Sequence, residues 1–158
     1  MPEAPDPRAA SDAATDDATR RVVPLTGLRG AVARNTTLGW QAPQVAMSVE
    51  ADVTRCESRR AALQESVGAA QKVTLTAFIL RAVALTLKEH PRMNALLKEH
   101  GVELVEDINL AFAVSLDEGL LAPAIRNADR KTVAELARES RELAEAARAF
   151  KLGPGAYQ

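Results

Sequence analysis

The sequence is poor in the residues that disulfide frameworks, metal sites and stacking surfaces require. Its 158 residues include one cysteine, Cys56, which excludes an intrachain disulfide and a zinc site built from several cysteines. A single cysteine also fits a reducing compartment, so a cytoplasmic location is expected. Aromatic residues make up 3% of the chain, which disfavours a stacking platform for single-stranded nucleic acid.

Long apolar runs and a strong net charge are absent too. No apolar run reaches the roughly 18 residues of a membrane-spanning helix, and the acidic N-terminus does not resemble a secretory signal. The net charge of -1 gives no bulk attraction to nucleic acid or to a membrane surface. Apolar residues nevertheless form 47% of the chain, enough for one domain with a packed core. The composition predicts a globular domain whose partners are neither nucleic acid nor membrane.

Residues 1–20 differ in composition from the rest. They contain Ala, Asp, Pro and Thr with almost no large side chain. Such a segment cannot bury enough surface to offset the entropy lost on ordering. We therefore expect a flexible linker at residues 1–20 and a folded domain at residues 21–158.

The most informative stretch covers residues 109–131. Large and small apolar residues alternate over 110–116, which predicts a strand packed on both faces. Residues 117–119 supply a turn with a glycine, and the apolar run 120–125 predicts the returning strand. Pro123 cannot donate a hydrogen bond to a ladder, so we expect it at an edge, a bulge or a subunit contact.

Hydrophobic periodicity and capping residues predict four helices and two further strands. The helices are expected from Thr26 to an anchoring Trp40, from a cap at Asp52 or Thr54 to residue 67, from Thr74 or Thr76 to about residue 90, and over 132–150; the strands are expected at 44–53 and 102–105, with one helical turn at 94–97. The third helix is apolar almost all round, which is typical of a helix in the middle of a fold. Together these elements predict an α/β domain.

Few residues of the chain can perform acid–base or nucleophilic chemistry. The two histidines, His90 before a proline and His100 in a polar turn, are expected to be solvated. Cys56 is expected to face the interior of its helix, which favours packing over a nucleophilic role. Asp117 and Glu118 form a carboxylate pair for which a solvated turn is the favoured interpretation. No glycine-rich phosphate loop, serine nucleophile elbow or metal-ligand spacing is present.

The basic pair Arg130 and Lys131 immediately precedes the last predicted helix. Free backbone N–H groups at a helix start attract phosphate, and two cations would strengthen that attraction. A solvated turn is the favoured alternative. Taken by themselves, the residues predict an α/β domain and no particular reaction.

Six motifs follow one another in a fixed order from residue 21 onward. They are VVPLTGLRGAVARN, WQAPQV, EADVT, TLTAFILRAVALTLKEHPRMNALL, INLAFAVSLDEGLLAPAIRNADRKTVAELA and KLGPGAYQ. In this order they resemble the catalytic domain of the dihydrolipoyl acyltransferases of 2-oxoacid dehydrogenase complexes. The resemblance implies part of a chloramphenicol-acetyltransferase-like fold, an α+β two-layer sandwich, and the N-terminal tail resembles the linkers that join domains in these enzymes.

The resemblance also implies an activity and its partners. Acyl groups would pass between dihydrolipoamide and coenzyme A, without a metal, in a site between the subunits of a trimer. Other components of the complex would be partners. Arg60 matches an arginine of the family in the helix after the D-V-T motif, and Lys131 matches a position that is basic in some members. Both are therefore candidates for binding coenzyme A phosphates, with a plain surface charge as the alternative for Arg60.

The chain departs from the family pattern in several places. The Gly-Gly-Thr-Phe-Thr strand and the catalytic His-x-x-x-Asp-Gly motif do not occur, so no catalytic residue is assigned. The family's Pro-His-Val reads Pro43-Gln44-Val45, and its Arg-Met reads Arg34-Asn35. The residues before the core are not expected to form a lipoyl-bearing domain. The chain is thus expected to be the N-terminal part of an acyltransferase domain, inactive alone and prone to self-association through an exposed apolar face. A non-catalytic assembly paralogue and half of an enzyme completed by a second chain are the alternatives.

Overall fold

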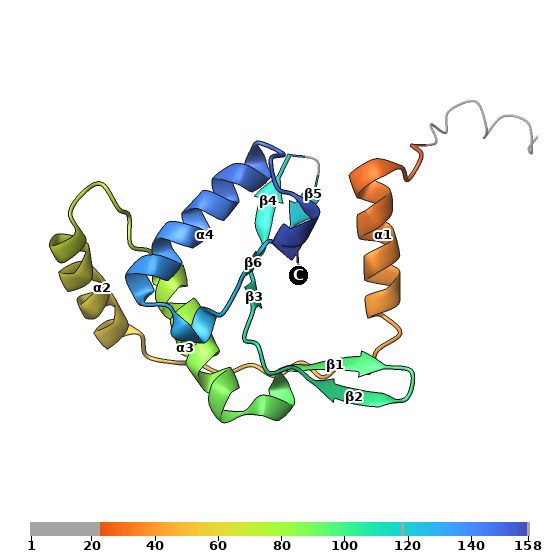
Figure 1. Cartoon of the computed structure of the whole chain (residues 1–158), viewed down its shortest axis with the longest axis horizontal. Coiled ribbons are helices and arrows are strands. Elements are labelled where there is room, and N and C mark those ends of the chain that lie inside the picture. The colour runs from red at the N-terminus through yellow and green to blue at the C-terminus, as the bar shows by residue number, and fades with distance from the viewer. Residues whose placement is uncertain (1–22, 118, 158) are drawn as a thin grey trace, which may run out of the picture. The chain divides into compact units, whose positions relative to one another are not determined.

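The computed structural model describes residues 23–117 and 119–157 (Figure 1). The chain divides into two compact units, Met1–Ala42 and Pro43–Gln158. The linker predicted at residues 1–20 lies outside the described residues.

The described part of the first unit contains helix α1, Gly27–Gly39. Thr26 occupies the predicted capping position with extended backbone, but its side chain makes no capping hydrogen bond. Gly30 is required because a Cβ atom there would lie 2.5 Å from the carbonyl oxygen of Leu25. The expectation that Trp40 anchors the end of this helix is wrong: its side chain is 81% exposed.

Residues 43–53 form neither helix nor strand, so the strand predicted at 44–53 is wrong. Its alternating large residues, Val45, Met47 and Val49, are 88%, 86% and 87% exposed. A strand needs a neighbouring strand to satisfy its backbone groups, and none of the described strands pairs with this segment. Alternation of side chains alone does not supply that partner.

Helix α2, Thr54–Val67, has Val53 at its N-cap position, between the two predicted candidates. Asp52 Oδ1 nevertheless accepts a hydrogen bond of 2.9 Å from the Thr54 backbone N–H. The apolar side of this helix is less buried than its sequence pattern indicates. No residue of α2 is buried, Cys56 is half-buried, and Val53 is 45% exposed. This helix therefore lies on the surface of the second unit.

Helix α3, Leu75–Glu89, begins and ends where the sequence predicts, with Thr74 as its cap and Pro91 just beyond its end. Its buried residues are small or lie on one side: Ala77, Leu80 and Ala84. Ile79 on the opposite side is 53% exposed. The expectation of a helix enclosed on all sides is thus wrong for the described residues, because only one face of α3 has a cover.

Two short strands follow α3 after a 3-10 turn at Pro91–Met93. Strand β1, Ala95–Lys98, pairs antiparallel with β2, Gly101–Leu104. The helical turn predicted at 94–97 is therefore wrong, whereas the strand predicted at 102–105 is confirmed with a shift of one residue. Asn94 fixes the entry to this hairpin, because its side-chain amide donates to the carbonyl of Val105 at 2.7 Å.

The predicted hairpin at 110–125 forms as four short strands in a single register. Strand β3, Leu110–Ala111, pairs with β6, Ala124–Ile125, and β4, Val114–Leu116, pairs with β5, Gly119–Leu121. The ladder is interrupted at Pro123, whose carbonyl still accepts a hydrogen bond of 3.1 Å from the Phe112 N–H. The small residues Ala111, Ala113 and Ser115 are exposed, so the first strand is packed on one face and not on both as predicted.

Helix α4, Val133–Arg148, ends two residues before the predicted limit. Phe150, the last residue of the predicted helix, lies beyond α4 with a φ of 53° and is 69% exposed. Thr132 and Glu135 form a capping box at the N-terminus of α4. None of the helices in the described part of the chain is long and apolar enough to cross a membrane.

The core of the second unit lies where α3 and α4 pack against each other and α4 packs against β4 and β6 (Figure 1). Ile125 of β6 and Leu136 of α4 are completely buried at this junction. The other members of the same cluster are Ala77, Leu80, Ala84, Ile108, Leu110, Ala128 and Ala137. The two helices and the hairpin thus share one core.

We predict that Thr132→Ala lowers the free energy of unfolding by about 1 kcal/mol, because α4 loses the hydroxyl that accepts from its N3 backbone N–H. Urea unfolding followed by circular dichroism measures the change. Thr86→Ala is the control, since the Thr86 hydroxyl only bonds back to the carbonyl of Ala82 within α3. Equal destabilisation by both substitutions would contradict the role given to the capping box.

Candidate functional site

Arg60 lies in the middle of α2, and its guanidinium is held at two nitrogens. Nε donates to Glu57 Oε2 at 2.7 Å, and Nη1 donates to the carbonyl of Val73 at 3.3 Å. The group therefore ties α2 to the segment that leads into α3. Nη2 makes no hydrogen bond with a described residue, so this half-buried guanidinium still has one nitrogen that can donate to a ligand.

Lys131 lies just before α4 and is half-buried. Its Nζ forms an ion pair with Glu139, two turns into the same helix. No hydrogen bond or ion pair joins Lys131 to Arg60 among the described residues. The two residues singled out in the sequence thus occupy separate places, and each has a carboxylate partner that sequence reasoning did not identify.

The N-terminus of α4 already holds a negative group. Glu135 Oε2 accepts hydrogen bonds from the Thr132 backbone N–H at 2.7 Å and from the Thr132 hydroxyl at 2.8 Å. These bonds, the backbone one first, lower the pKa of Glu135 below its usual 4.5. The backbone donors expected to hold a phosphate beside Arg130 and Lys131 are therefore partly taken by this carboxylate.

Arg130 lines a cavity of about 590 Å³ beyond the end of α3. Lys88 and Asp129 form an ion pair of 3.8 Å in its wall. The Asp129 carbonyl also accepts from Arg81 Nη1 at 2.7 Å. Two further acidic residues, Glu106 and Asp107, line the same cavity, so its charges are mixed with a slight acidic excess and do not favour a phosphate.

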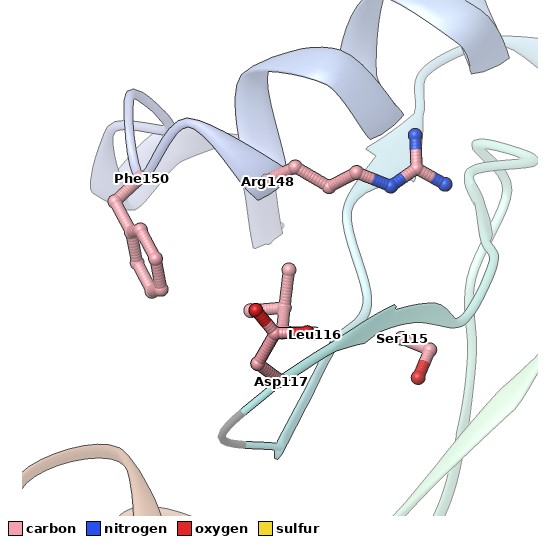
Figure 2. A pocket seen from close by; sticks show the side chains of 5 residues that line it. All are labelled: Ser115, Leu116, Asp117, Arg148 and Phe150. Carbon is pink, nitrogen blue, oxygen red and sulfur yellow. The ribbon is translucent and has the colours of Figure 1, made fainter.

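A smaller cavity of about 360 Å³ lies at the tip of the predicted hairpin. Ser115, Leu116 and Asp117 come from β4 and its turn, and Arg148 and Phe150 come from the end of α4. Figure 2 shows the Arg148 and Phe150 side chains diverging from the helix end, with Leu116 and Asp117 between them. The cavity offers a hydroxyl, a carboxylate, a guanidinium and a ring, but no imidazole or thiol to transfer a proton near neutral pH.

Sequence reasoning singled out Asp117 only as part of a carboxylate pair in a solvated turn, and it did not single out Arg148 or Phe150 for this cavity. It extended the last helix through Phe150, which placed that side chain in the core. The end of α4 at Arg148 instead leaves both side chains at the hairpin. The residues directly after Arg148 are Ala149 and Phe150, and neither is the glycine that commonly ends a helix, so no local signal marked this early end.

The remaining candidates lie apart from one another. His90 and His100 are exposed, as predicted, after α3 and between β1 and β2 respectively. Cys56 is half-buried in α2. Among the described residues, no three His, Cys, Asp or Glu side chains gather closely enough to hold a metal ion. The described part of the chain therefore assembles binding groups, and it assembles no nucleophile beside a base.

We predict that Glu135→Gln reduces the loss of stability on acidification. Because the folded-state pKa of Glu135 is lowered, its contribution is present above the usual value and is lost as the pH falls through the folded-state value. Urea midpoints at about pH 7 and about pH 3 should therefore differ less in this variant than in the parent. Glu65→Gln is the control, as Glu65 is exposed. An unchanged pH dependence in Glu135→Gln would contradict the capping geometry.

Comparison with known proteins shows the family to which this chain is similar. The family described as 2-oxoacid dehydrogenases acyltransferase (catalytic domain) matches residues 17–158. Among relatives, the dihydrolipoyllysine-residue acetyltransferase component of the pyruvate dehydrogenase complex of Azotobacter vinelandii is 40% identical over 141 residues, covering 86% of this chain and 22% of that protein. The lipoamide acyltransferase component of the branched-chain alpha-keto acid dehydrogenase complex of Bacillus subtilis is 32% identical over 151 residues, covering 94% and 36%.

Two solved structures match the fold over the complete chain. They are the dihydrolipoamide acetyltransferase of Azotobacter vinelandii and the cubic core of the pyruvate dehydrogenase multienzyme complex, each with a TM-score of 0.83 and 35% identity, covering 100% of this chain and 65% of the other. The chain thus spans 22% and 36% of the two relatives and 65% of the two solved chains. These matches confirm the predicted α/β, chloramphenicol-acetyltransferase-like fold class. The chain belongs to the family of 2-oxoacid dehydrogenase acyltransferase catalytic domains.

Proposed function

We propose that residues 21–158 form the N-terminal part of a catalytic domain that transfers an acyl group between dihydrolipoamide and coenzyme A in a 2-oxoacid dehydrogenase complex. One observation carries this proposal: the whole chain matches a dihydrolipoamide acetyltransferase with a TM-score of 0.83 at 35% identity. The family match begins at residue 17, so residues 1–16 lie outside the matched domain, and the linker proposed at residues 1–20 overlaps the match by four residues. The two relatives serve a pyruvate and a branched-chain complex, so the proposal covers acyl groups in general.

Within this function, we assign Arg60 and Lys131 to the phosphates of coenzyme A. Both are cationic and half-buried, and each is steadied by one carboxylate. The Arg60 Nη2 group and the remaining Lys131 ammonium hydrogens can still donate. Charge-assisted hydrogen bonds of this kind are about twice as strong as neutral ones. The two side chains would hold the coenzyme while the reaction occurs elsewhere.

The chemistry itself needs a base for the thiol and donors for the tetrahedral oxyanion. In the dihydrolipoamide acetyltransferase of Azotobacter vinelandii, a serine, a histidine and an asparagine have been investigated for their role in the catalytic mechanism. In the described part of this chain, neither exposed histidine lines the cavity at the hairpin tip. We therefore assign residues 21–158 a binding and positioning role, without a catalytic residue.

Assembly belongs to the same proposal. One of the matching structures is the cubic core of a multienzyme complex, which supports self-association of this chain as a trimer or a larger core. The second unit also exposes large apolar side chains on α3 and on the β1–β2 hairpin, and such surfaces favour association. The proposal also includes the other components of the 2-oxoacid dehydrogenase complex as binding partners and a cytoplasmic location.

We predict that the 158-residue polypeptide gives no acetyl transfer from acetyl coenzyme A to dihydrolipoamide above background, yet binds coenzyme A. Turnover is measured as new thioester, and binding by calorimetry. Transfer that appears on adding a polypeptide with the missing serine and histidine motifs would support a catalytic domain completed by a second chain. Turnover by the polypeptide alone would contradict the binding role. Absence of both coenzyme binding and complementation would favour an assembly paralogue.

We predict that Arg60→Ala and Lys131→Ala each weaken coenzyme A binding by about tenfold, since each removes one charge-assisted hydrogen bond. Arg59→Ala and Lys98→Ala are the controls: Arg59 is an exposed neighbour on α2, and Lys98 pairs with Glu103 on the β1–β2 hairpin. Titration calorimetry gives the four dissociation constants. The assignment fails if the controls weaken binding as much as the two test variants do.

A further inference from the structure

A basic groove runs between the start of α3, strand β4 and one face of α4. Its lining includes three cations and four hydroxyl groups: Lys72, Arg141, Arg148, Thr74, Thr76, Ser115 and Ser140. Its volume is about 450 Å³. Ser115 and Arg148 also line the cavity at the hairpin tip (Figure 2), so the two hollows adjoin.

The charges around the basic groove are of one sign. No Asp or Glu is among its lining residues. The side chains of Lys72 and Arg148 make no ion pair or hydrogen bond with another residue in the described part of the chain. Arg141 is only loosely engaged, at 3.9 Å from Glu145 and 3.4 Å from the carbonyl of Ala70. This contrasts with Arg60, whose partner Glu57 lies at 2.7 Å.

The start of α3 adds to the positive field. Thr74 caps this 15-residue helix, and Thr76 lies in its first turn; both line the basic groove. The first turn of α3 contains no acidic residue, whereas the first turn of α4 contains Glu135. The positive end of the α3 dipole therefore has no carboxylate of its own to balance it.

Hydrogen-bond donors remain available at the same place. The hydroxyls of Thr76 and Ser115 bond to no other described residue, while the Ser140 hydroxyl donates to the carbonyl of Ala137. A guanidinium, an ammonium and two hydroxyls suit the oxygen atoms of a phosphate, and arginine can bind such a group through two bonds. The volume lies within the range of about 300 to 1,000 Å³ found for small-molecule sites.

We propose that the basic groove binds the phosphate groups of a small phosphorylated ligand, with Lys72 and Arg148 as the main contacts and Thr76 and Ser115 as additional donors. Phosphate is the chemistry that the groove recognises. The identification of coenzyme A as the phosphorylated ligand rests on the proposed function. The affinity for phosphate rests only on the charges and hydrogen-bond donors of the groove. Coenzyme A carries a diphosphate and a separate 3′-phosphate, so the groove would hold one of these groups while Arg60 and Lys131 hold the other.

The test titrates the full 158-residue chain with inorganic pyrophosphate and, separately, with coenzyme A. Lys72→Met and Arg148→Met remove one charge each from exposed side chains, so circular dichroism should show unchanged folding. Each variant is expected to bind pyrophosphate about tenfold more weakly. The matched control is Arg138→Met on the same helix, because Arg138 pairs with Glu142 at 3.0 Å and does not line the groove.

Two outcomes support the inference. If both ligands bind and both lose affinity in the groove variants, coenzyme A is the source of the phosphate. If only pyrophosphate binds, and it does so through the groove, the phosphate site stands while the coenzyme part of the proposed function fails.

Two outcomes overturn it. If coenzyme A binding is insensitive to Lys72→Met and Arg148→Met but sensitive to Arg60→Ala, the groove is not the coenzyme A phosphate site. The proposed function would then remain intact. Pyrophosphate binding that is absent, or equally weakened by Arg138→Met, would show that the groove has no specific affinity for phosphate.

Discussion

Burial of Ile125 and Leu136 in one hydrophobic cluster is the interaction on which the second unit depends. Both side chains have no exposed surface, and complete burial of each contributes about 1.5 to 3 kcal/mol. Ile125 belongs to a ladder of only two residue pairs, and a hairpin of this kind is marginal in water by itself. Ala77 and Ala84 have no exposed surface either, and their small side chains let α3 approach the same centre. The core therefore stabilises the hairpin, and the hairpin in turn positions both hollows at α4.

Prediction from sequence succeeded where the signal was local. The start of α3 at its Thr74 cap, the start of α4 after Thr132 and the register of β4 with β5 depend on residues a few positions apart, and they lie where they were expected. It failed where a distant partner decides the outcome. The alternating segment 44–53 has no strand beside it among the described residues, and residues 95–98, three of which were expected in a helical turn, form a strand because β2 pairs with them.

The site was predictable only in part. The family resemblance made Arg60 and Lys131 candidates for binding coenzyme A phosphates, and the comparisons confirm that family. It did not reveal that Glu57 and Glu139 hold these cations, because ion pairs depend on side-chain geometry. Nor could it assemble the basic groove, whose rim comes from a loop, a strand and a helix far apart in the sequence. The residues taken by themselves also predicted no reaction. The proposed reaction rests on the resemblance of whole motifs to the family.

The central claim is that α3, α4 and the hairpin of β3 to β6 form one cooperative core. Native-state hydrogen exchange tests it most directly, because it gives an opening free energy for each amide. The account predicts the same opening free energy and urea dependence for the amides of Phe112, Ala128 and Leu136, which bond to Pro123, Ile108 and Thr132 respectively. Val105, whose amide bonds to Asn94 beside the β1–β2 hairpin, should exchange through smaller openings. Exchange of Phe112 and Ala128 at a lower free energy than Leu136 would contradict the claim.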